Sequence, residues 1–248
     1  MKKIGSALVF SLLLPIQVMA ADLTVSAAAS LTNAFKEMAP IFEKQNPGTK
    51  VLLNFAASGS LLQQIIKGAP VDVFASADQE TMSQAEQAGC VKNGDQKIFA
   101  SNQLVVIVPK GSKQNPTGLS DLTKTQYQKI AIGLPASVPV GRYTKLALEK
   151  KNLWGVLESK MISAQSVRQA LDYVARSEVD AGFVYSTDAV ILPNEVTQAF
   201  VVPVDLPILY PIAPINGSPN NILANKFVAF VVSPQGREIL SSHGFGKP

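Results

Sequence analysis

Four short stretches of the sequence consist mostly of small, neutral residues. Each lies just after an apolar run and just before a helical repeat. They are residues 27–30 (AAAS), 55–60 (FAASGS), 137–143 (SVPVGRY) and 163–167 (SAQSV). Each is predicted to open a helix, whose first backbone amides have no intrahelical partner. Those amides and the helix dipole attract negative charge, so such a turn binds an anion without a cationic side chain. Several of these turns aimed at one point would hold a small, fully ionised oxyanion.

Three serines in these turns also have a simpler interpretation. Ser30, Ser58 and Ser166 could each cap the helix that follows, because serine is a favoured N-cap residue. Ser166 and Gln169 have the spacing of a capping box. For any single turn, local capping is the more common explanation, so the anion hypothesis depends on all four turns together.

The elements that must position these turns alternate between strand and helix. Strands are predicted over residues 23–26, 50–55, 71–75, 104–108, 129–133 and 181–185, with apolar residues at helical spacing between them. This alternation is typical of the α/β class. In open α/β sheets, ligands bind outside the carboxyl ends of the strands, which is where the predicted helices begin.

The first twenty residues are predicted to be a secretory signal peptide cleaved after Ala20. Lys2 and Lys3 precede an apolar run at residues 7–14, and small residues lie at 18–20. A membrane anchor is the alternative, but that run is shorter than the roughly 20 residues a bilayer span needs. Cleavage removes two positive charges from a formal net charge of +4. The remainder is too small to indicate nucleic-acid or membrane binding.

The single cysteine and the single histidine bear on location and on rival chemistries. Cys90 has no partner for an internal disulfide and lies far from the cleavage site, which predicts a free, soluble, exported protein. A serine hydrolase would have to combine His243 with Ser58 or Ser30, yet no G-x-S-x-G elbow follows a strand. Cys and His spacings typical of zinc sites are also missing from the sequence.

Two aspartates could form a carboxylate site. Asp72 and Asp78 flank an apolar segment, but Asp78 stands before residues 79–81 (QET), where an N-cap is expected. An acid/base pair or a metal site is therefore the less favoured interpretation of these two residues.

Residues 23–245 resemble the periplasmic molybdate-binding proteins of ABC transporters. The segments that carry the resemblance are TVSAAASLTNAF, NFAASGSLLQQI, GAPVDVFASADQ, NQLVVIVPKG, VPVGRY, SVRQAL and GFVYSTDAV, in the order and at the spacings of that family. The resemblance implies a protein that binds molybdate, and also tungstate, in the periplasm and delivers it to a membrane permease. It implies neither catalysis nor a cofactor.

The resemblance also implies which residues hold the oxyanion: Ser30, Ser58, Val140, Val167 and Tyr185. The serines would each supply an amide and a hydroxyl, the valines an amide each, and the tyrosine its phenol. Val140 stands where the family usually has alanine, a change that leaves the amide available. These groups would bind the oxygens of a tetrahedral anion, so no protein atom would bond to molybdenum.

A site built only from neutral donors selects among oxyanions on physical grounds. It disfavours an anion that still carries a proton, such as hydrogen phosphate, because that proton finds no acceptor. Sulfate has the charge and shape of molybdate but shorter bonds, so its oxygens would fall short of donors set for the larger ion. A binding protein for sulfate or another oxyanion nevertheless remains the nearer alternative, and an exported serine hydrolase the more distant one.

The fold that the resemblance implies is an α/β periplasmic binding protein of type II with two lobes and a two-strand hinge. Lobe 1 would comprise residues 22–101 and 207–248, lobe 2 residues 102–206, and each would be a mixed sheet flanked by helices. The ligand would bridge the lobes of a monomer. Arg168 could reach the anion, but a pairing with Asp172 at i,i+4 spacing is the simpler expectation.

Overall fold

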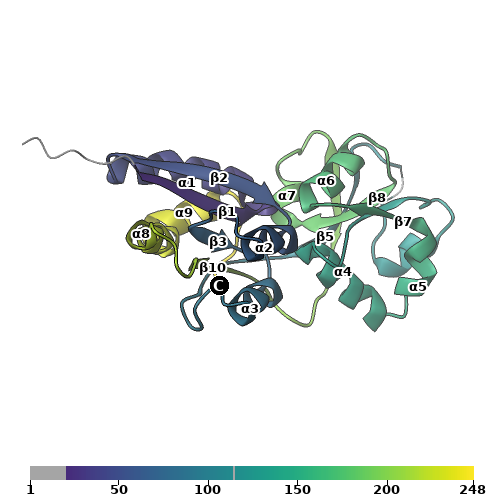
Figure 1. Cartoon of the computed structure of the whole chain (residues 1–248). Helices are drawn as coiled ribbons and strands as arrows, with labels where there is room; N and C mark the ends of the chain where they lie inside the picture. The colour runs from purple at the N-terminus through teal and green to yellow at the C-terminus, as the bar shows by residue number, and fades with distance from the viewer. Residues whose placement is uncertain (1–20, 114) are drawn as a thin grey trace, which may run out of the picture.

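The computed structural model of the chain describes residues 21–113 and 115–248. The predicted signal peptide, residues 1–20, lies outside the described residues. Two bodies lie side by side, each built on its own sheet, and the chain passes between them twice (Figure 1). The predicted α/β fold with two mixed sheets is confirmed.

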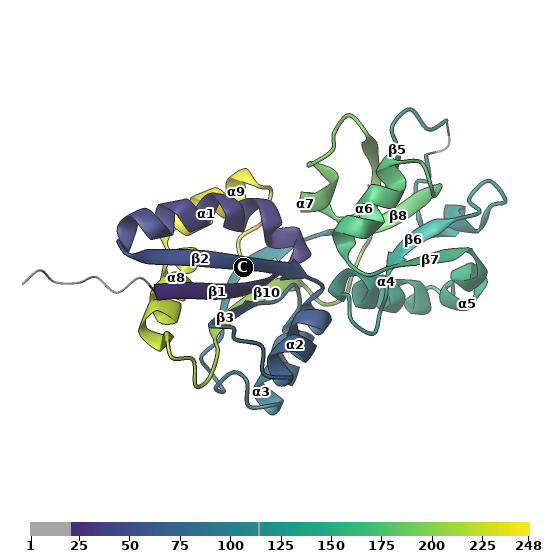
Figure 2. The same ribbon diagram turned by 45° about the horizontal axis from the view of Figure 1, so that its top comes forward.

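The first sheet has the strand order β2-β1-β3-β10-β4. Its strands are β1 (Ala21–Ala28), β2 (Thr49–Ala56), β3 (Val73–Ala75), β4 (Lys97–Asn102) and β10 (Ile208–Pro214). β1 runs parallel to β2 and β3, whereas β10 runs antiparallel to β3 and β4. The helical segments are η1 (Ala29–Leu31), α1 (Thr32–Gln45), α2 (Ser58–Ile66), α3 (Gln79–Gln87), α8 (Asn221–Val232) and α9 (Pro234–Ser242). Helices α1, α8 and α9 cover one face of the sheet, and α2 and α3 the other (Figure 2).

The second sheet has the order β7-β6-β8-β5-β9. Its strands are β5 (Leu104–Pro109), β6 (Ile130–Gly133), β7 (Met161–Ala164), β8 (Ala181–Tyr185) and β9 (Val196–Val201). β6 is parallel to β7 and β8, and β5 is antiparallel to β8 and β9. The helical segments are η2 (Leu119–Thr123), α4 (Pro139–Lys150), α5 (Trp154–Leu157), η3 (Glu158–Lys160), α6 (Val167–Ala175) and α7 (Ser186–Ala189).

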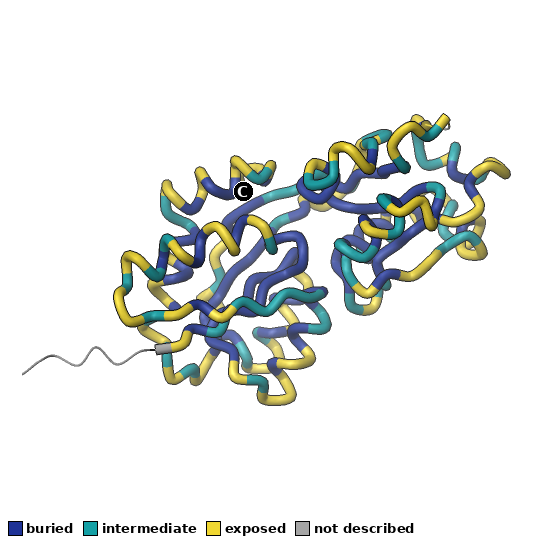
Figure 3. The backbone as a smooth tube through the Cα atoms, turned by 90° about the horizontal axis from the view of Figure 1, so that it is seen from above, coloured by how far each residue is buried: buried dark blue, intermediate teal, exposed yellow. Residues whose placement is uncertain are grey.

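The central strands of both sheets are buried between the helices. In Figure 3 the tube inside each body is mainly dark blue, and most of the yellow lies on the outer turns. In the second sheet, residues 104–108 of β5 are each 0% exposed. Such continuous apolar runs are typical of strands covered on both faces. Within the described part of the chain, no helix has the length and apolar character that crossing a membrane requires.

Several predicted helix boundaries follow from local sequence. Pro139 occupies the first position of α4, where its missing donor costs no hydrogen bond. Gly68 follows the end of α2 with φ of +87°, a backbone conformation that glycine adopts without strain. The starts of α2, α4 and α6 lie toward the space between the two sheets (Figure 2), and η1 borders the same space.

Candidate functional site

The five residues predicted to hold the anion line one cavity between the two sheets. The cavity is small, with a volume of about 10 Å³ as measured with a water-sized sphere. Ser30 and Ser58 reach it from the first sheet, and Val140, Val167 and Tyr185 reach it from the second. The remaining lining residues are Ala28, Ala29, Ala56, Ala57, Ala77, Val138 and Pro139. Among the residues that the structure describes, none that lines this cavity carries a charge.

Backbone amides at helix starts form much of the available donor set. Ser58 and Val167 are the first residues of α2 and α6, and Val140 is the second residue of α4. Amides at these positions have no intrahelical carbonyl to bond. Ser30 lies in η1, the short turn that precedes α1. Three regular helices and one 3-10 turn therefore present their amino ends to a single small space.

Ser30 and Ser58 do not cap their own helices. The residue before α1 is Leu31 and the residue before α2 is Ala57, and neither helix start has a side-chain cap. The Ser30 hydroxyl lies 3.1 Å from the Tyr210 hydroxyl, and the Ser58 hydroxyl accepts the Ala77 N–H at 3.0 Å. The local capping interpretation is therefore wrong for these two serines.

Ser166, by contrast, is an N-cap as the spacing predicts. Its hydroxyl accepts the backbone N–H of Gln169 at 3.2 Å. The Gln169 side chain accepts the N–H of Gln165, one residue before the cap, rather than that of Ser166 itself. Ser166 thus supports the start of α6, and Val167 behind it lines the cavity.

Tyr185 is buried at the end of β8, with 1% of its surface exposed. Burial raises the pKa of its phenol well above the ordinary value, and the nearby Tyr210 raises it further. The hydroxyl is therefore protonated at any physiological pH and remains a donor. It donates a long hydrogen bond to the carbonyl of Ala77, at 3.4 Å.

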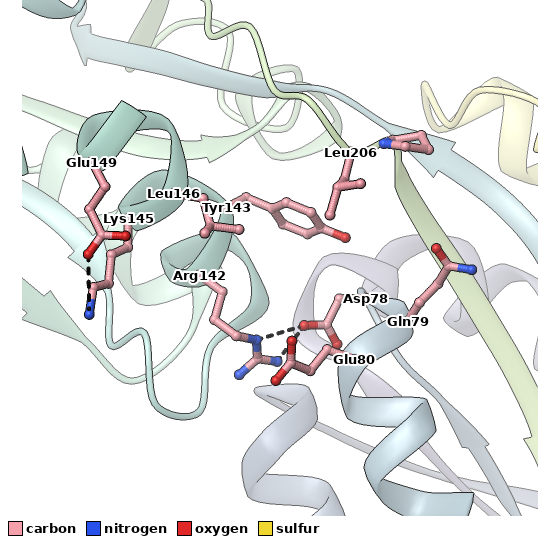
Figure 4. A pocket seen from close by; sticks show the side chains of 10 residues that line it. Asp78, Gln79, Glu80, Arg142, Tyr143, Lys145, Leu146, Glu149 and Leu206 are labelled. Carbon is pink, nitrogen blue, oxygen red and sulfur yellow. Dashed lines mark hydrogen bonds and ion pairs between the residues drawn. The ribbon is translucent and has the colours of Figure 1, made fainter. Parts of the chain in front are cut away.

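An ion pair that the sequence did not reveal joins the two sheets beside the cavity. Arg142 of α4 donates to Asp78 through Nε at 2.8 Å (Figure 4). Its Nη2 also donates to the Thr81 hydroxyl at 2.6 Å. Asp78 is also the predicted N-cap of α3, since its side chain accepts the N–H of Thr81. The only sequence signal for the pair is that Arg142 lies two residues after Val140.

Arg168 pairs with a residue other than the expected one. Its Nε lies 2.7 Å from Oδ1 of Asp188, so the prediction of Asp172 as partner is wrong. The pair is an ion contact without the alignment of a hydrogen bond. The guanidinium also donates to Asn33 at 3.1 Å and to the Ser30 carbonyl at 3.3 Å, both in the first sheet's body. Arg168 thus joins the two bodies, and it is not among the residues that line the cavity.

Asp188 is fully buried behind the site. Burial raises the pKa of its carboxyl to about 6, although Arg168 acts in the opposite direction. The carboxylate is therefore mostly ionised at neutral pH, and it balances the charge of Arg168. Arg168 is thus neutralised by its own partner rather than left for the ligand.

The arrangement does not assemble the rival chemistries. His243 contacts Glu37, with 2.7 Å between Nε2 and Oε2. The hydroxyls of Ser30 and Ser58 have other partners, and within the described ranges neither makes a hydrogen bond to His243. Those ranges also contain no cluster of three histidine, cysteine or acidic side chains able to hold a metal ion. Burial raises the pKa of the Cys90 thiol, which disfavours the reactive thiolate.

Known proteins resemble this chain along nearly its full length. The model of a family described as bacterial extracellular solute-binding protein matches residues 23–246. The molybdate-binding protein ModA of Escherichia coli (strain K12) is 37% identical over 230 residues, covering 90% of this chain and 88% of that protein. ModA of Haemophilus influenzae is 34% identical over 232 residues, covering 91% and 90% respectively.

Two solved structures match the fold at lower identity. The periplasmic molybdate-binding protein of Azotobacter vinelandii has a TM-score of 0.79 at 24% identity, covering 91% of this chain and 99% of that chain. The sulfate-binding protein SubI of Mycobacterium tuberculosis has a TM-score of 0.80 at 18% identity, covering 90% and 86%. At these identities the likeness shows the fold alone, so it does not distinguish one oxyanion from another.

Proposed function

The chain belongs to the bacterial extracellular solute-binding proteins, in the family of the molybdate-binding protein ModA, and from this premise we propose that it binds molybdate between its two sheets. It binds tungstate in the same way and delivers the anion to the membrane permease of an ABC transporter. The observation that carries the proposal is the lining of the cavity, which combines helix-start amides and hydroxyls with no charged side chain among the described residues.

Neutral donors suit a dianion that must be released again. Backbone amides and hydroxyls held in place by the fold stabilise the charge through charge-assisted hydrogen bonds. A buried cation in their place would need its own desolvation to be offset and would accept anions of many shapes. The proposed ligands are Ser30, Ser58, Val140, Val167 and Tyr185. They bind the oxygens of a tetrahedral anion, and the protein contributes no atom bonded to the metal.

Binding is coupled to closure of two lobes, which we place at residues 22–101 with 207–248 and at residues 102–206. The chain crosses between the sheets at residues 102–104 and 201–208, and these crossings form the proposed hinge. Contacts between the lobes include the Gly59 N–H donating to the Ser137 carbonyl at 3.0 Å and the Arg142–Asp78 pair. An anion that completes the donor set stabilises this closed arrangement over an open one.

The remaining properties follow from this role. The protein is exported to the periplasm with residues 1–20 removed, acts as a monomer, and needs no cofactor. It performs no catalysis, in keeping with relatives that are solute-binding proteins. A binding protein for another oxyanion such as sulfate is a rival with the same fold, and a size difference between sulfate and molybdate separates the two.

A thermal-shift panel of four oxyanions tests the proposed function. At about 100 times its Kd, a ligand adds roughly 2.7 kcal/mol to the free energy of unfolding, about 5 to 10 °C in Tm for a chain of this size. We expect molybdate and tungstate to produce such a shift, and sulfate and phosphate at equal concentration to produce little. Equal shifts from all four would indicate a general anion binder, and a shift from sulfate alone would indicate the sulfate-binding rival.

A further inference from the structure

A chain of hydrogen bonds leads from the crossing between the sheets to the Ser30 hydroxyl. It begins at Asn102, the last residue of β4. Asn102 Oδ1 accepts the Gln103 N–H at 2.9 Å and the Ser186 hydroxyl at 2.9 Å. A backbone N–H can only donate, so this contact fixes which end of the amide is oxygen. The Asn102 NH₂ group therefore faces Thr187 and Tyr210, to which it donates at 2.9 and 3.1 Å.

The direction of the next hydrogen bond follows from Tyr210. Its side chain is 0% exposed, and its oxygen already accepts from Asn102. A buried hydroxyl proton needs an acceptor. Within the described structure, the other hydrogen-bond partner of the Tyr210 hydroxyl is the Ser30 oxygen, at 3.1 Å. Tyr210 therefore donates to Ser30. Burial raises the pKa of the Tyr210 phenol well above its ordinary value, so this proton stays in place.

The tyrosine ring has little freedom to change this geometry. It packs edge-on against Phe99, Tyr185 and Phe245, with ring centroids 6.2, 5.8 and 5.4 Å away. Close-packed aromatic neighbours hold a ring in one orientation, which fixes where its hydroxyl points. The Tyr210 oxygen is thus a rigid support for the Ser30 side chain.

We infer that Tyr210 and Asn102 are positioning residues that orient the Ser30 hydroxyl so that it donates to the bound anion. This inference rests on the proposed function. Because the Ser30 oxygen accepts a hydrogen bond from Tyr210, the Ser30 hydroxyl proton is not needed for that contact and is free to point into the cavity. Hydrogen bonds in such a chain also polarise one another, so Ser30 becomes a stronger donor. Ser58 is set up in the same way by a backbone amide, that of Ala77.

The direction of the chain can be reversed by one nearly isosteric substitution. In Asn102→Asp, the carboxylate accepts a hydrogen bond from the Tyr210 hydroxyl. The Tyr210 oxygen then accepts a hydrogen bond from Ser30, and Ser30 turns a lone pair toward the anion. We expect Asn102→Asp to weaken molybdate binding about 100-fold at pH 8. Tyr210→Phe removes the support without reversing it, and we expect a loss of only about 3- to 10-fold.

The double variant Asn102→Asp/Tyr210→Phe separates the relay from the added charge. Without the Tyr210 hydroxyl, the carboxylate cannot act on Ser30. The factor by which Asn102→Asp raises the molybdate Kd should therefore be at least about fivefold smaller in the Tyr210→Phe background than in the wild-type background. Tyr127→Phe, at a buried tyrosine that does not line the cavity, is the matched control and should bind like wild type. Thermal unfolding of each ligand-free variant checks that it is folded.

Two negative outcomes have different meanings. If wild type binds molybdate and Asn102→Asp costs the same with and without the Tyr210 hydroxyl, the relay is wrong and the proposed function stands. If wild type does not bind molybdate, the proposed function is wrong and this inference falls with it.

Discussion

Replacing Gly59 by alanine is expected to weaken molybdate binding by about 30- to 150-fold, although Gly59 offers no side chain to the ligand. Gly59 lies in the first turn of α2 and its N–H donates to the Ser137 carbonyl of the other lobe. A Cβ at this position would lie 2.7 Å from the Ser137 oxygen and 2.9 Å from its Cα. Both are backbone atoms that cannot rotate away, and overpacking of this kind costs about 2 to 3 kcal/mol.

The clash arises only when the lobes are together, so ligand-free Gly59→Ala should unfold near the wild-type temperature. Alanine also has a higher helix propensity than glycine, so the substitution should not lower the stability of α2. Gly155→Ala is the matched control, because a Cβ there meets nothing within 4 Å. Calorimetric titration of the three proteins with molybdate gives the comparison. Wild-type affinity in Gly59→Ala would mean that the anion is bound without the close approach of α2 to Ser137.

Ser30→Ala and Ser58→Ala are each expected to weaken molybdate binding by about 10- to 150-fold. Each change removes one hydroxyl donor to a charged ligand, which is worth about 1.5 to 3 kcal/mol. The two backbone amides remain, so binding should be weakened rather than abolished. Both serines are buried, at 3% and 0% exposure, so water cannot easily replace the lost donor.

Ser60→Ala provides the control for these two variants. Ser60 lies on the same helix as Ser58, two residues further along, and does not line the cavity. Its replacement should leave the molybdate Kd unchanged. Native affinity in both Ser30→Ala and Ser58→Ala would remove these residues from the site, whatever the ligand.

All central strands except β10 could be predicted from the sequence, and most of the edge strands could not. All six predicted strands are present, with boundaries that differ by a few residues. β4, β7 and β9 were missed, and each lies at an edge of its sheet. An edge strand is covered less completely and so carries a weaker apolar pattern; Ile162 of β7 and Val201 of β9, for example, are exposed.

β10 escaped prediction for a different reason. It contains Pro211 and ends at Pro214, and proline removes a donor from the ladder. The strand accommodates Pro211 at an irregularity, since its register against β4 shifts between Tyr210 and Pro211. The strand forms because it pairs with β3 and β4, which are distant in the sequence, and no local sequence pattern indicates that pairing.

That the five candidate ligands line one cavity could be predicted, because each lies in a short segment that resembles a known family. Their mutual support could not, because it depends on side chains that meet only after folding. Arg142 and Asp78 are 64 positions apart, and Ser30 and Tyr210 are 180 apart. The same limitation explains the wrong partner for Arg168, where spacing along one helix favoured Asp172 and the fold supplied Asp188.

Calorimetric titration of the protein lacking residues 1–20 tests the central claim most directly. The account predicts one molybdate bound per chain with a Kd below about 1 µM, and sulfate binding at least about 100-fold more weakly, or 2.7 kcal/mol. Two results would contradict it. One is that molybdate at about 100 µM neither produces binding heat nor competes with tungstate; the other is a sulfate affinity equal to that for molybdate.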